Sequence, residues 1–352
     1  MIRPGSEAEL AEAVRDASGP LSVRGGGTRG LLPEGTPLTT SGLSGIVLHD
    51  PAALTLVALA GTPVEEIDAT LARANQRLAF EPMDHRALLG TKGTPTIGGV
   101  VAANVSGPRR MQVGAARDHL LGLRFVDGEG TIVKNGGRVM KNVTGYDLAR
   151  LLAGSRGALG VITEVALKVL PGTETTANLV IHGLDDATAV RAMSDALGTP
   201  FEVSGAAHDP HAPDGPRTEL RLEGFGASVA YRCQALAERL KAHGSWETET
   251  DRDAVRAHWR GIRDAARSTG GRAMSGASRC VQARRPPSWR GPGPRRPSMI
   301  GAAGWCGCAC RRETTCARGW AAMMATPRWS ARPPRSTPHC RRRSPSLRRC
   351  SA

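Results

Sequence analysis

Three successive glycines follow a short apolar segment near the start of the chain, in the string Val23-Arg-Gly-Gly-Gly-Thr28. Because glycine has no Cβ, the backbone N–H groups of such a loop can converge on an anion. The string is therefore interpreted as a binding loop for a pyrophosphate, and the alternative interpretation is a tight turn without a ligand. The string lacks the Gly-Lys-Ser/Thr of a P-loop and the helix behind the glycines of a dinucleotide-binding motif, so simple NAD binding is disfavoured.

Three further strings are rich in glycine and other small residues. The second runs from Thr94 to Gly107, and its paired glycines would let backbone lie flat against a planar ligand, with polar anchors at Thr96, Asn104 and Ser106. The third runs from Gly114 to Asp127 and the fourth from Gly154 to Thr163. Each string alone is also compatible with an ordinary loop.

Together, and in this order, the four strings resemble the flavoprotein family of the vanillyl-alcohol oxidase and p-cresol methylhydroxylase type. The resemblance implies an extended FAD clasped by two α+β subdomains. The stretches SGPRRMQVGAARDHLLGLRFVDGEG and GGRVMKNVTGYDLARLLAGSRGALGVITEVALKVLP are similar to the FAD-binding E subunits of bacterial glycolate oxidases. The implied domains are an FAD-binding domain over residues 1–171, a partial α+β cap-like domain over 172–273 and a tail over 274–352.

The resemblance also implies which residues hold the cofactor. The pyrophosphate would lie on the first string, the ribityl and isoalloxazine part on the second, and the flavin or adenosine near the start of a strand. These three sets are Gly25, Gly26, Gly27 and Thr28; Thr96, Gly98, Gly99, Ser106 and Gly107; and Gly160, Val161 and Ile162. Arg109 and Arg110 would neutralise a phosphate or a substrate carboxylate, or are ordinary surface arginines.

Histidine does not indicate a covalent flavin or a metal. His49, His85 and His119 are not in a recognisable tethering context, so the FAD is expected to be non-covalent and these side chains structural or exposed. The pair His208 and His211 has metal-like spacing, but its Pro, Asp and Gly neighbours favour a solvated loop. We therefore expect no metal site, and the sequence names no catalytic residue.

The implied function is that of an FAD-binding subunit of a glycolate (2-hydroxy acid) oxidase or dehydrogenase complex that converts glycolate to glyoxylate. The expected partners are a second, catalytic FAD-containing subunit and an iron–sulfur subunit, with no nucleic acid. Two alternatives stay open: a self-sufficient FAD-dependent hydroxy-acid dehydrogenase, and a non-catalytic assembly subunit. The expected location is cytoplasmic, with at most peripheral membrane association through the complex, because the start of the chain has no apolar signal segment and no stretch is long enough to span a bilayer.

Secondary structure that would position the strings follows from local patterns. Ser6 and Glu9 predict a capping box at the start of a helix that ends before Gly19. Strands are expected at 21–24, 54–60 and 161–170, a helix at 64–75, and a hairpin that joins 123–126 to 131–134. The stretch 90–114 shows few helix signals. In residues 141–147, Tyr146 is expected to pack and Asp147 to cap a helix over 146–152.

The region after Pro171 predicts a different α+β pattern. Strands are expected at 178–182, 201–204 and 218–223, and helices at 185–197, 227–243 and 254–267. The order resembles half of an α+β sandwich. The whole chain is thus expected to have an α+β fold.

The net charge of +15 is concentrated in the last 79 residues. Residues 274–352 contain 17 Arg and a single acidic residue, Glu313, whereas residues 1–273 have a net charge of −1. Seven of the eight Cys also lie there, with very few branched apolar residues. By itself such a segment is expected to be disordered.

A frameshift between about Arg267 and Cys280 is our main hypothesis for this tail. If the Trp- and Cys-containing stretch is written in GC-rich codons and translated in the shifted reading frame, it can encode an ordinary apolar strand followed by an acidic turn. A thiolate metal site, an Arg-rich nucleic-acid arm and a natural solvated linker are the alternatives. The coding DNA decides, because a shifted frame interrupted by stop codons would reject the hypothesis.

Overall fold

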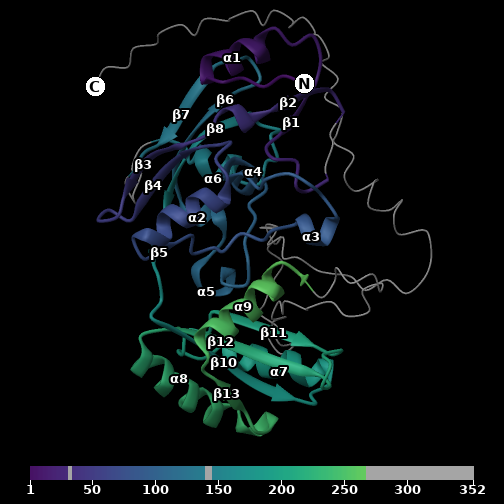
Figure 1. Ribbon diagram of the computed structural model, residues 1–352, viewed down its shortest axis with the longest axis vertical. Coiled ribbons are helices and arrows are strands. Elements are labelled where there is room, and N and C mark those ends of the chain that lie inside the picture. Colours follow the sequence, from purple (N-terminus) through teal and green to yellow (C-terminus); the bar gives the residue numbers. More distant parts are fainter. Residues whose placement is uncertain (31–33, 139–144, 267–352) are drawn as a thin grey trace, which may run out of the picture. The chain divides into compact units, whose positions relative to one another are not determined.

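The computed structural model describes residues 1–30, 34–138 and 145–266 (Figure 1). All expectations for the tail over 274–352, and those for residues 141–144, lie outside the described residues. The described chain contains helices and mainly antiparallel sheets, so the expected α+β class is confirmed.

A five-stranded antiparallel sheet forms the centre of the first part, in the order β3-β4-β8-β6-β7. Its strands are β3 (Ile46–Asp50), β4 (Thr55–Leu59), β6 (Leu120–Val126), β7 (Ile132–Gly136) and β8 (Val161–Lys168). The almost continuously apolar β4 lies between two neighbours and is buried along its length. The hairpin expected between β6 and β7 is present, closed by the side chain of Asp127, which accepts from the backbone N–H of Glu129 and Thr131.

Three helices pack their apolar residues against this sheet (Figure 1). They are α2 (Val64–Arg73), α4 (Ile97–Ala102) and α6 (Leu148–Leu152). Two short helices, α3 (Arg86–Leu89) and α5 (Arg110–Val113), and two 3-10 turns, Thr40–Gly42 and Ala116–His119, complete the connections. The two-stranded pair β5 (Gln76–Arg77) and β9 (Leu170–Pro171) closes the end of this part.

A second small core lies around the first helix and the first two strands. Helix α1 (Glu7–Arg15) buries Leu10 and Ala11 against the parallel pair β1 (Leu21–Arg24) and β2 (Thr36–Thr39). Ser6 caps α1 as expected, since its side chain accepts from the backbone N–H of Glu9. The Glu9 side chain reaches Gly5 rather than Ser6, so the reciprocal half of the capping box is displaced by one residue.

Replacing Ser6 with alanine tests this cap. The substitution leaves a backbone N–H at the start of α1 without its acceptor, so the free energy of unfolding should fall by about 1 kcal/mol. Urea unfolding measures the change. Ser18→Ala, at an exposed position outside any helix, is the control and should leave the midpoint unchanged.

The second part is a four-stranded antiparallel sheet in the order β11-β12-β10-β13. Its strands are β10 (Thr175–His182), β11 (Gly205–Asp209), β12 (Arg217–Gly224) and β13 (Glu247–Glu249). With α7 (Asp186–Leu197) and α8 (Gly226–Arg239) the chain order is β-α-β-β-α-β, which is the order of a ferredoxin-like unit. A 3-10 turn, Lys241–His243, follows α8.

The two faces of this sheet are covered by different helices. Apolar residues of α7 and α8 form one core with the sheet, whereas α9 (Arg252–Arg263) places Val255 and Trp259 against Ala207 on the other face (Figure 1). The Trp259 side chain is almost fully buried, donates to the Asn178 side chain and lies under the Arg221 guanidinium at 4.6 Å.

Several local expectations were wrong. A helix, α4, lies inside the stretch expected to have few helix signals, because Thr96 caps it and its glycines fit close against neighbouring backbone. The strand expected at 201–204 begins at Gly205 instead, since Glu202 has a positive φ of 53°. Tyr146 is 85% exposed and does not pack, whereas Asp147 caps α6 as expected.

Candidate functional site

The glycine string that follows β1 lies directly on the backbone of the second string. A Cβ on Gly26 would lie 1.6 Å from the carbonyl oxygen of Thr94, and one on Gly25 would lie 2.3 Å from Oγ1 of Thr96. In the same way, a Cβ on Gly93 would lie 2.1 Å from the carbonyl oxygen of Gly26. The two strings therefore approach each other more closely than any residue with a side chain would allow.

This packing corrects the reason given for Gly26. The sequence suggested that its missing Cβ leaves room for an anion, whereas the atom it would meet is the Thr94 backbone. Gly27 is the open position: its φ is 71° and nothing lies within 4 Å of where its Cβ would be. Thr28 is held at its carbonyl by the Thr91 hydroxyl at 2.6 Å.

The fourth string lies against the first two. The backbone N–H of Gly154 donates to the Val101 carbonyl at 3.1 Å, and that of Arg156 donates to the Ala102 carbonyl at 2.8 Å. A Cβ on Gly157 would lie 3.5 Å from Cβ of Val23, the first residue of the first string. The structure thus brings three of the four strings together around α4.

Cationic side chains gather at this meeting point. Arg29 donates to the Gly99 carbonyl, and burial together with the positive charge of Arg156 lowers the pKa of Arg29 to about 10. Burial and the charge of Arg29 also lower the pKa of His85. Because Arg29 and Arg156 repel each other here, an anion placed between them would be stabilised.

Two buried polar atoms in the same strings have no hydrogen-bond partner within the described part of the chain. They are Nε of Arg24, at the end of β1, and Oγ of Ser155. Buried polar groups are nearly always paired, so each marks a place where a ligand or water completes the contacts. Both atoms can donate a hydrogen bond, as an anionic ligand requires.

The remaining expected residues of the second string have packing roles in the structure. Thr96 caps α4, and Gly98 fits against Ala60, where a Cβ would lie 2.5 Å from that of Ala60. Gly99 faces the Arg29 guanidinium. Ser106 accepts from the backbone N–H of Ala116 at 2.9 Å and so fixes the third string.

Gly107, the last expected residue of the second string, contacts the segment after β5. It donates to the Phe80 carbonyl, and a Cβ at this position would lie 2.3 Å from the Glu81 carbonyl oxygen.

The expected residues at the start of β8 lie in the central sheet. Val161 pairs with Val126 and Ile162 with Phe125, and both side chains are buried in apolar clusters. A Cβ on Gly160 would lie 2.8 Å from the Phe125 ring. These contacts are sufficient to explain the three residue types, and a contact with the cofactor stays a prediction.

Arg109 is neither an exposed arginine nor a free cation. Its guanidinium pairs with Glu81 and also with Glu223 of β12, at 2.7 and 2.8 Å. Arg221 of β12 bridges the same two carboxylates, at 3.1 Å from Glu81 and 3.6 Å from Glu223. The segment that carries Gly107 is therefore joined to the second sheet by a buried ionic network.

The network controls the ionisation of Glu223. Burial by itself raises the pKa of this carboxyl, but hydrogen bonds from Arg109 and the charges of Arg221, Arg109 and Arg77 outweigh burial. The pKa of Glu223 is consequently far below its ordinary value, and the carboxylate stays charged in the folded protein.

The histidines have structural contacts. His49 bonds to the Gln76 side chain at 2.9 Å, and His119 is buried beside Phe80 with the Val113 carbonyl at 3.1 Å. The expectation for His208 was wrong, because it is buried in β11 and bonds to Thr218 rather than lying in a solvated loop. Within the described residues, three or more side chains that could hold a metal ion do not come together.

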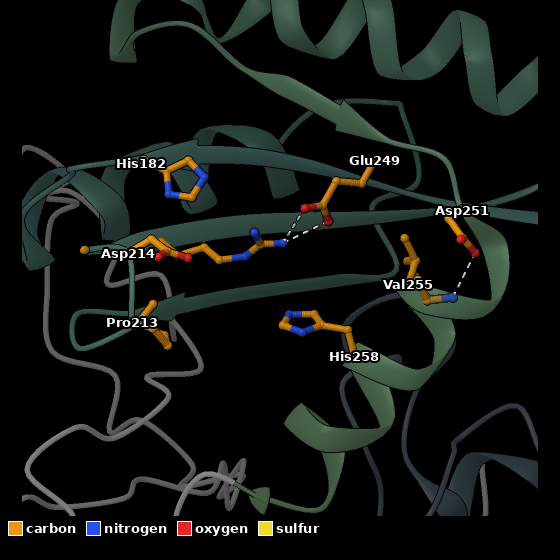
Figure 2. Close-up of a pocket in the computed structure, with 11 residues that line it drawn as sticks. His182, Pro213, Asp214, Glu249, Asp251, Val255 and His258 are labelled. Carbon is orange, nitrogen blue, oxygen red and sulfur yellow. Dashed lines mark hydrogen bonds and ion pairs between the residues drawn. The ribbon is translucent and has the colours of Figure 1, made fainter.

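A hollow of about 430 Å³ lies on the second part, lined by residues of the sheet and α9 (Figure 2). Figure 2 shows Glu249, His182, Asp214 and His258 around it. Glu249 is paired with Arg217 at 2.8 Å, and His258 with the buried Glu219 at 2.7 Å. Both pairs are internal to this part of the chain, and the pair of His258 and Glu219 anchors α9 to the sheet.

Among the helices of residues 1–30, 34–138 and 145–266, none is both long and apolar enough to cross a bilayer.

Comparison with known proteins supports the cofactor assignment. Residues 1–136 match the family model described as FAD binding domain. The chain is 36% identical over 244 residues to glycolate oxidase subunit GlcE of Escherichia coli, covering 68% of this chain and 65% of that protein. It is 33% identical to glycolate oxidase subunit GlcD of Bacillus subtilis, over 51% of this chain and 37% of the relative.

More distant relatives share the same region. A D-lactate dehydrogenase of Archaeoglobus fulgidus is 30% identical over 58% of this chain and 44% of its own length. The chain therefore spans less than two thirds of each of these curated relatives. Among solved structures, an alkyldihydroxyacetonephosphate synthase superposes with a TM-score of 0.61 over 74% of this chain and 54% of its own, at 15% identity, which shows a common fold.

The glycine strings, the cations around them and the match over residues 1–136 lead to one conclusion. Residues 1–136 are similar to the FAD binding domain family, and this similarity indicates FAD as the cofactor.

Proposed function

We propose that the chain is the FAD-binding subunit of a complex that oxidises glycolate or a related 2-hydroxy acid. The observation that carries the proposal is the meeting of three glycine strings beside Arg29 and Arg156. The similarity to two glycolate oxidase subunits supports the choice of substrate.

The residues at this meeting point fit an FAD. Gly27 faces open space at a positive φ, so its backbone is accessible to a pyrophosphate, while Arg29 and Arg156 supply positive charge. The unpartnered donors on Arg24 and Ser155 would complete the contacts. We call these five residues the FAD cradle, and we propose that they hold the cofactor without a covalent bond.

When bound, FAD supplies the acceptor for the hydride that leaves the alcohol carbon of a 2-hydroxy acid. The chain's own residues would orient the cofactor and neutralise its phosphates. The ion pairs of Arg109 with Glu81 and Glu223 would hold the segment that contains Gly107 in a fixed position against the second sheet. A catalytic acid or base is not assigned.

The names of the relatives support a heteromeric complex, because GlcE and GlcD are both described as subunits. We propose a second, catalytic FAD-containing subunit and an iron–sulfur subunit as partners. The similarity to a D-lactate dehydrogenase favours a second candidate, a self-sufficient hydroxy-acid dehydrogenase. A non-catalytic assembly subunit is the third.

An anaerobic visible spectrum of the FAD-loaded chain distinguishes these functions. Flavin absorbance that stays unchanged when glycolate is added, but bleaches after the partner subunits are added, supports a subunit of a complex. Bleaching by a hydroxy acid with the chain alone supports the self-sufficient enzyme. Flavin that never bleaches in the complex supports an assembly role, and a chain that binds no flavin contradicts all of these oxidoreductase functions.

Replacing Arg29 with glutamine tests the cationic part of the cradle. Loss of one charge-assisted contact should weaken FAD binding about tenfold. Quenching of flavin fluorescence measures the dissociation constant. Arg29→Lys keeps the charge and should restore most of the affinity, while Arg239→Gln, at an exposed position on α8, should change nothing. Unchanged affinity in Arg29→Gln would remove Arg29 from the site.

A further inference from the structure

A cavity of about 680 Å³ lies apart from the glycine strings. Its walls come from α2 and β5, from the segment between β9 and β10, and from the exposed side of α9. Seven arginines line it against four carboxylates, so the lining carries an excess of positive charge. None of the residues of the first or fourth glycine string is among the lining residues.

Part of this positive charge is neutralised within the wall. Arg109 and Arg221 share the carboxylates of Glu81 and Glu223, and Arg263 pairs with Asp264 at 2.7 Å. One nitrogen of Arg77 also pairs with Glu223, at 3.1 Å. The charges of these arginines are thus balanced by carboxylates of the protein. They do not account for the other arginines of α9.

Two arginines one turn apart on α9, Arg256 and Arg260, form no ion pair with a carboxylate of the described residues. Arg256 donates to the neutral backbone carbonyl of Thr173 at 2.7 Å, and the guanidinium of the exposed Arg260 has no hydrogen bond or ion pair with another described residue. Burial and the charge of Arg252 lower the pKa of Arg256 and outweigh the opposing charges of Glu223 and Asp253. The cavity therefore contains cations that its wall does not neutralise.

Two buried polar atoms in the same wall also lack a partner within the described chain. They are Nε of Arg77 and Oγ1 of Thr176. Thr176 is 1% exposed, so its hydroxyl has no access to bulk water except through the cavity. Leaving such a group without a partner costs free energy, which a bound acceptor would recover.

We propose that this cavity is a binding site for a small, multiply charged oxyanion, held by Arg77, Arg256 and Arg260 with the Thr176 hydroxyl. Dicarboxylates and phosphate monoesters share the required chemistry, which is two or more negative charges carried on oxygen acceptors. A volume of about 680 Å³ is within the usual range for a small-molecule site. The site does not depend on the proposed oxidation of a hydroxy acid.

The location suggests what such a ligand would do. The cavity wall includes Arg109 and Glu223, which join the Gly107 segment to the second sheet, and Gly172 and Thr173, which connect the two sheets. A bound anion would therefore contact both parts of the chain and hold them together.

Isothermal titration of the FAD-loaded full-length chain tests the proposal, with sodium malonate and inorganic phosphate as separate probes. Sodium chloride at matched ionic strength is the background. At least one probe should bind saturably at one site per chain. Binding of malonate alone assigns the dicarboxylate class, binding of phosphate alone assigns the phosphate class, and binding of neither probe overturns the proposal.

Two variants locate the binding. Arg260→Gln, at an exposed side chain without a partner, should fold normally and weaken the bound probe about tenfold. Thr176→Val keeps the shape and removes only the hydroxyl, and should weaken it several-fold. The control Arg239→Gln should bind like the wild type. Wild-type affinity in both Arg260→Gln and Thr176→Val would place the anion elsewhere and overturn the assignment. The flavin spectrum of both variants should stay unchanged, which shows that the FAD site is intact and that any loss of anion binding is separate from it.

Discussion

Gly26→Ala is expected to abolish FAD binding and to destabilise the protein by about 3 kcal/mol. The new Cβ would lie 1.6 Å from the Thr94 carbonyl oxygen, and both partners are backbone, so neither can move aside as a flexible side chain would. The two glycine strings must separate, and Gly27 then loses its position beside Arg29. The flavin-to-protein absorbance ratio after desalting, together with urea unfolding, measures both effects.

Gly19→Ala is the matched control for this prediction. Nothing lies within 4 Å of its Cβ position, and the residue lies two positions before the start of β1. The variant should retain wild-type flavin content and stability. Normal flavin content in Gly26→Ala would show that the contact between the two strings is not needed to bind the cofactor.

Glu223→Gln is expected to lower the free energy of unfolding by about 3–5 kcal/mol. The carboxylate is almost fully buried and pairs with Arg109 and Arg77, so a neutral side chain of the same shape leaves buried guanidinium groups uncompensated. Urea unfolding at neutral pH measures the loss. Glu238→Gln, in an exposed pair with Lys241, should change stability by less than about 0.5 kcal/mol.

The pH dependence of stability gives a second measurement on the same variant. The pKa of Glu223 is far lower in the folded protein than the value of about 4.3 expected for an unfolded chain. Its contribution is therefore present above the unfolded pKa and declines as the pH falls below about 5. The wild type should lose stability more steeply than Glu223→Gln between about pH 5 and pH 3. Parallel pH profiles would contradict the role of the network.

Local patterns in the sequence predict most of the elements that carry the site. Ser6 indicates the start of α1, the apolar run of β4 indicates a central strand, and the turn at Asp127 indicates the β6–β7 hairpin. Each of these signals comes from neighbouring residues and needs no knowledge of the fold. The helix α4 was missed because it has only six residues, two of them glycines.

The candidate site could be predicted only in part, because its charged groups come from distant segments. Arg29 and Arg156 are 127 positions apart in the chain. Arg29 directly follows the first glycine string and Arg156 lies within the fourth, and neither arginine has a distinctive sequence pattern of its own. Glu81 and Glu223 are likewise ordinary in sequence and are linked in the structure through Arg109 and Arg221. The glycines were identifiable by type, but the atoms that require them become apparent only in three dimensions.

Elements of the second sheet were also difficult to predict from local sequence patterns. Strand β13 has three exposed residues and no apolar alternation, so no local signal indicates it. It pairs with the edge of β10 through backbone contacts that depend on the preceding helix α8. The arginines of α9 similarly resemble a solvated helical face in sequence, although they line the cavity in the structure.

The visible spectrum of the full-length chain, mixed with FAD and desalted, tests the central claim most directly. We predict a flavin band with one FAD per chain, which moves into the supernatant when the protein is precipitated with acid. A protein that is colourless after desalting would contradict the assignment of FAD to the glycine strings, and flavin that stays on the precipitated protein would contradict non-covalent binding.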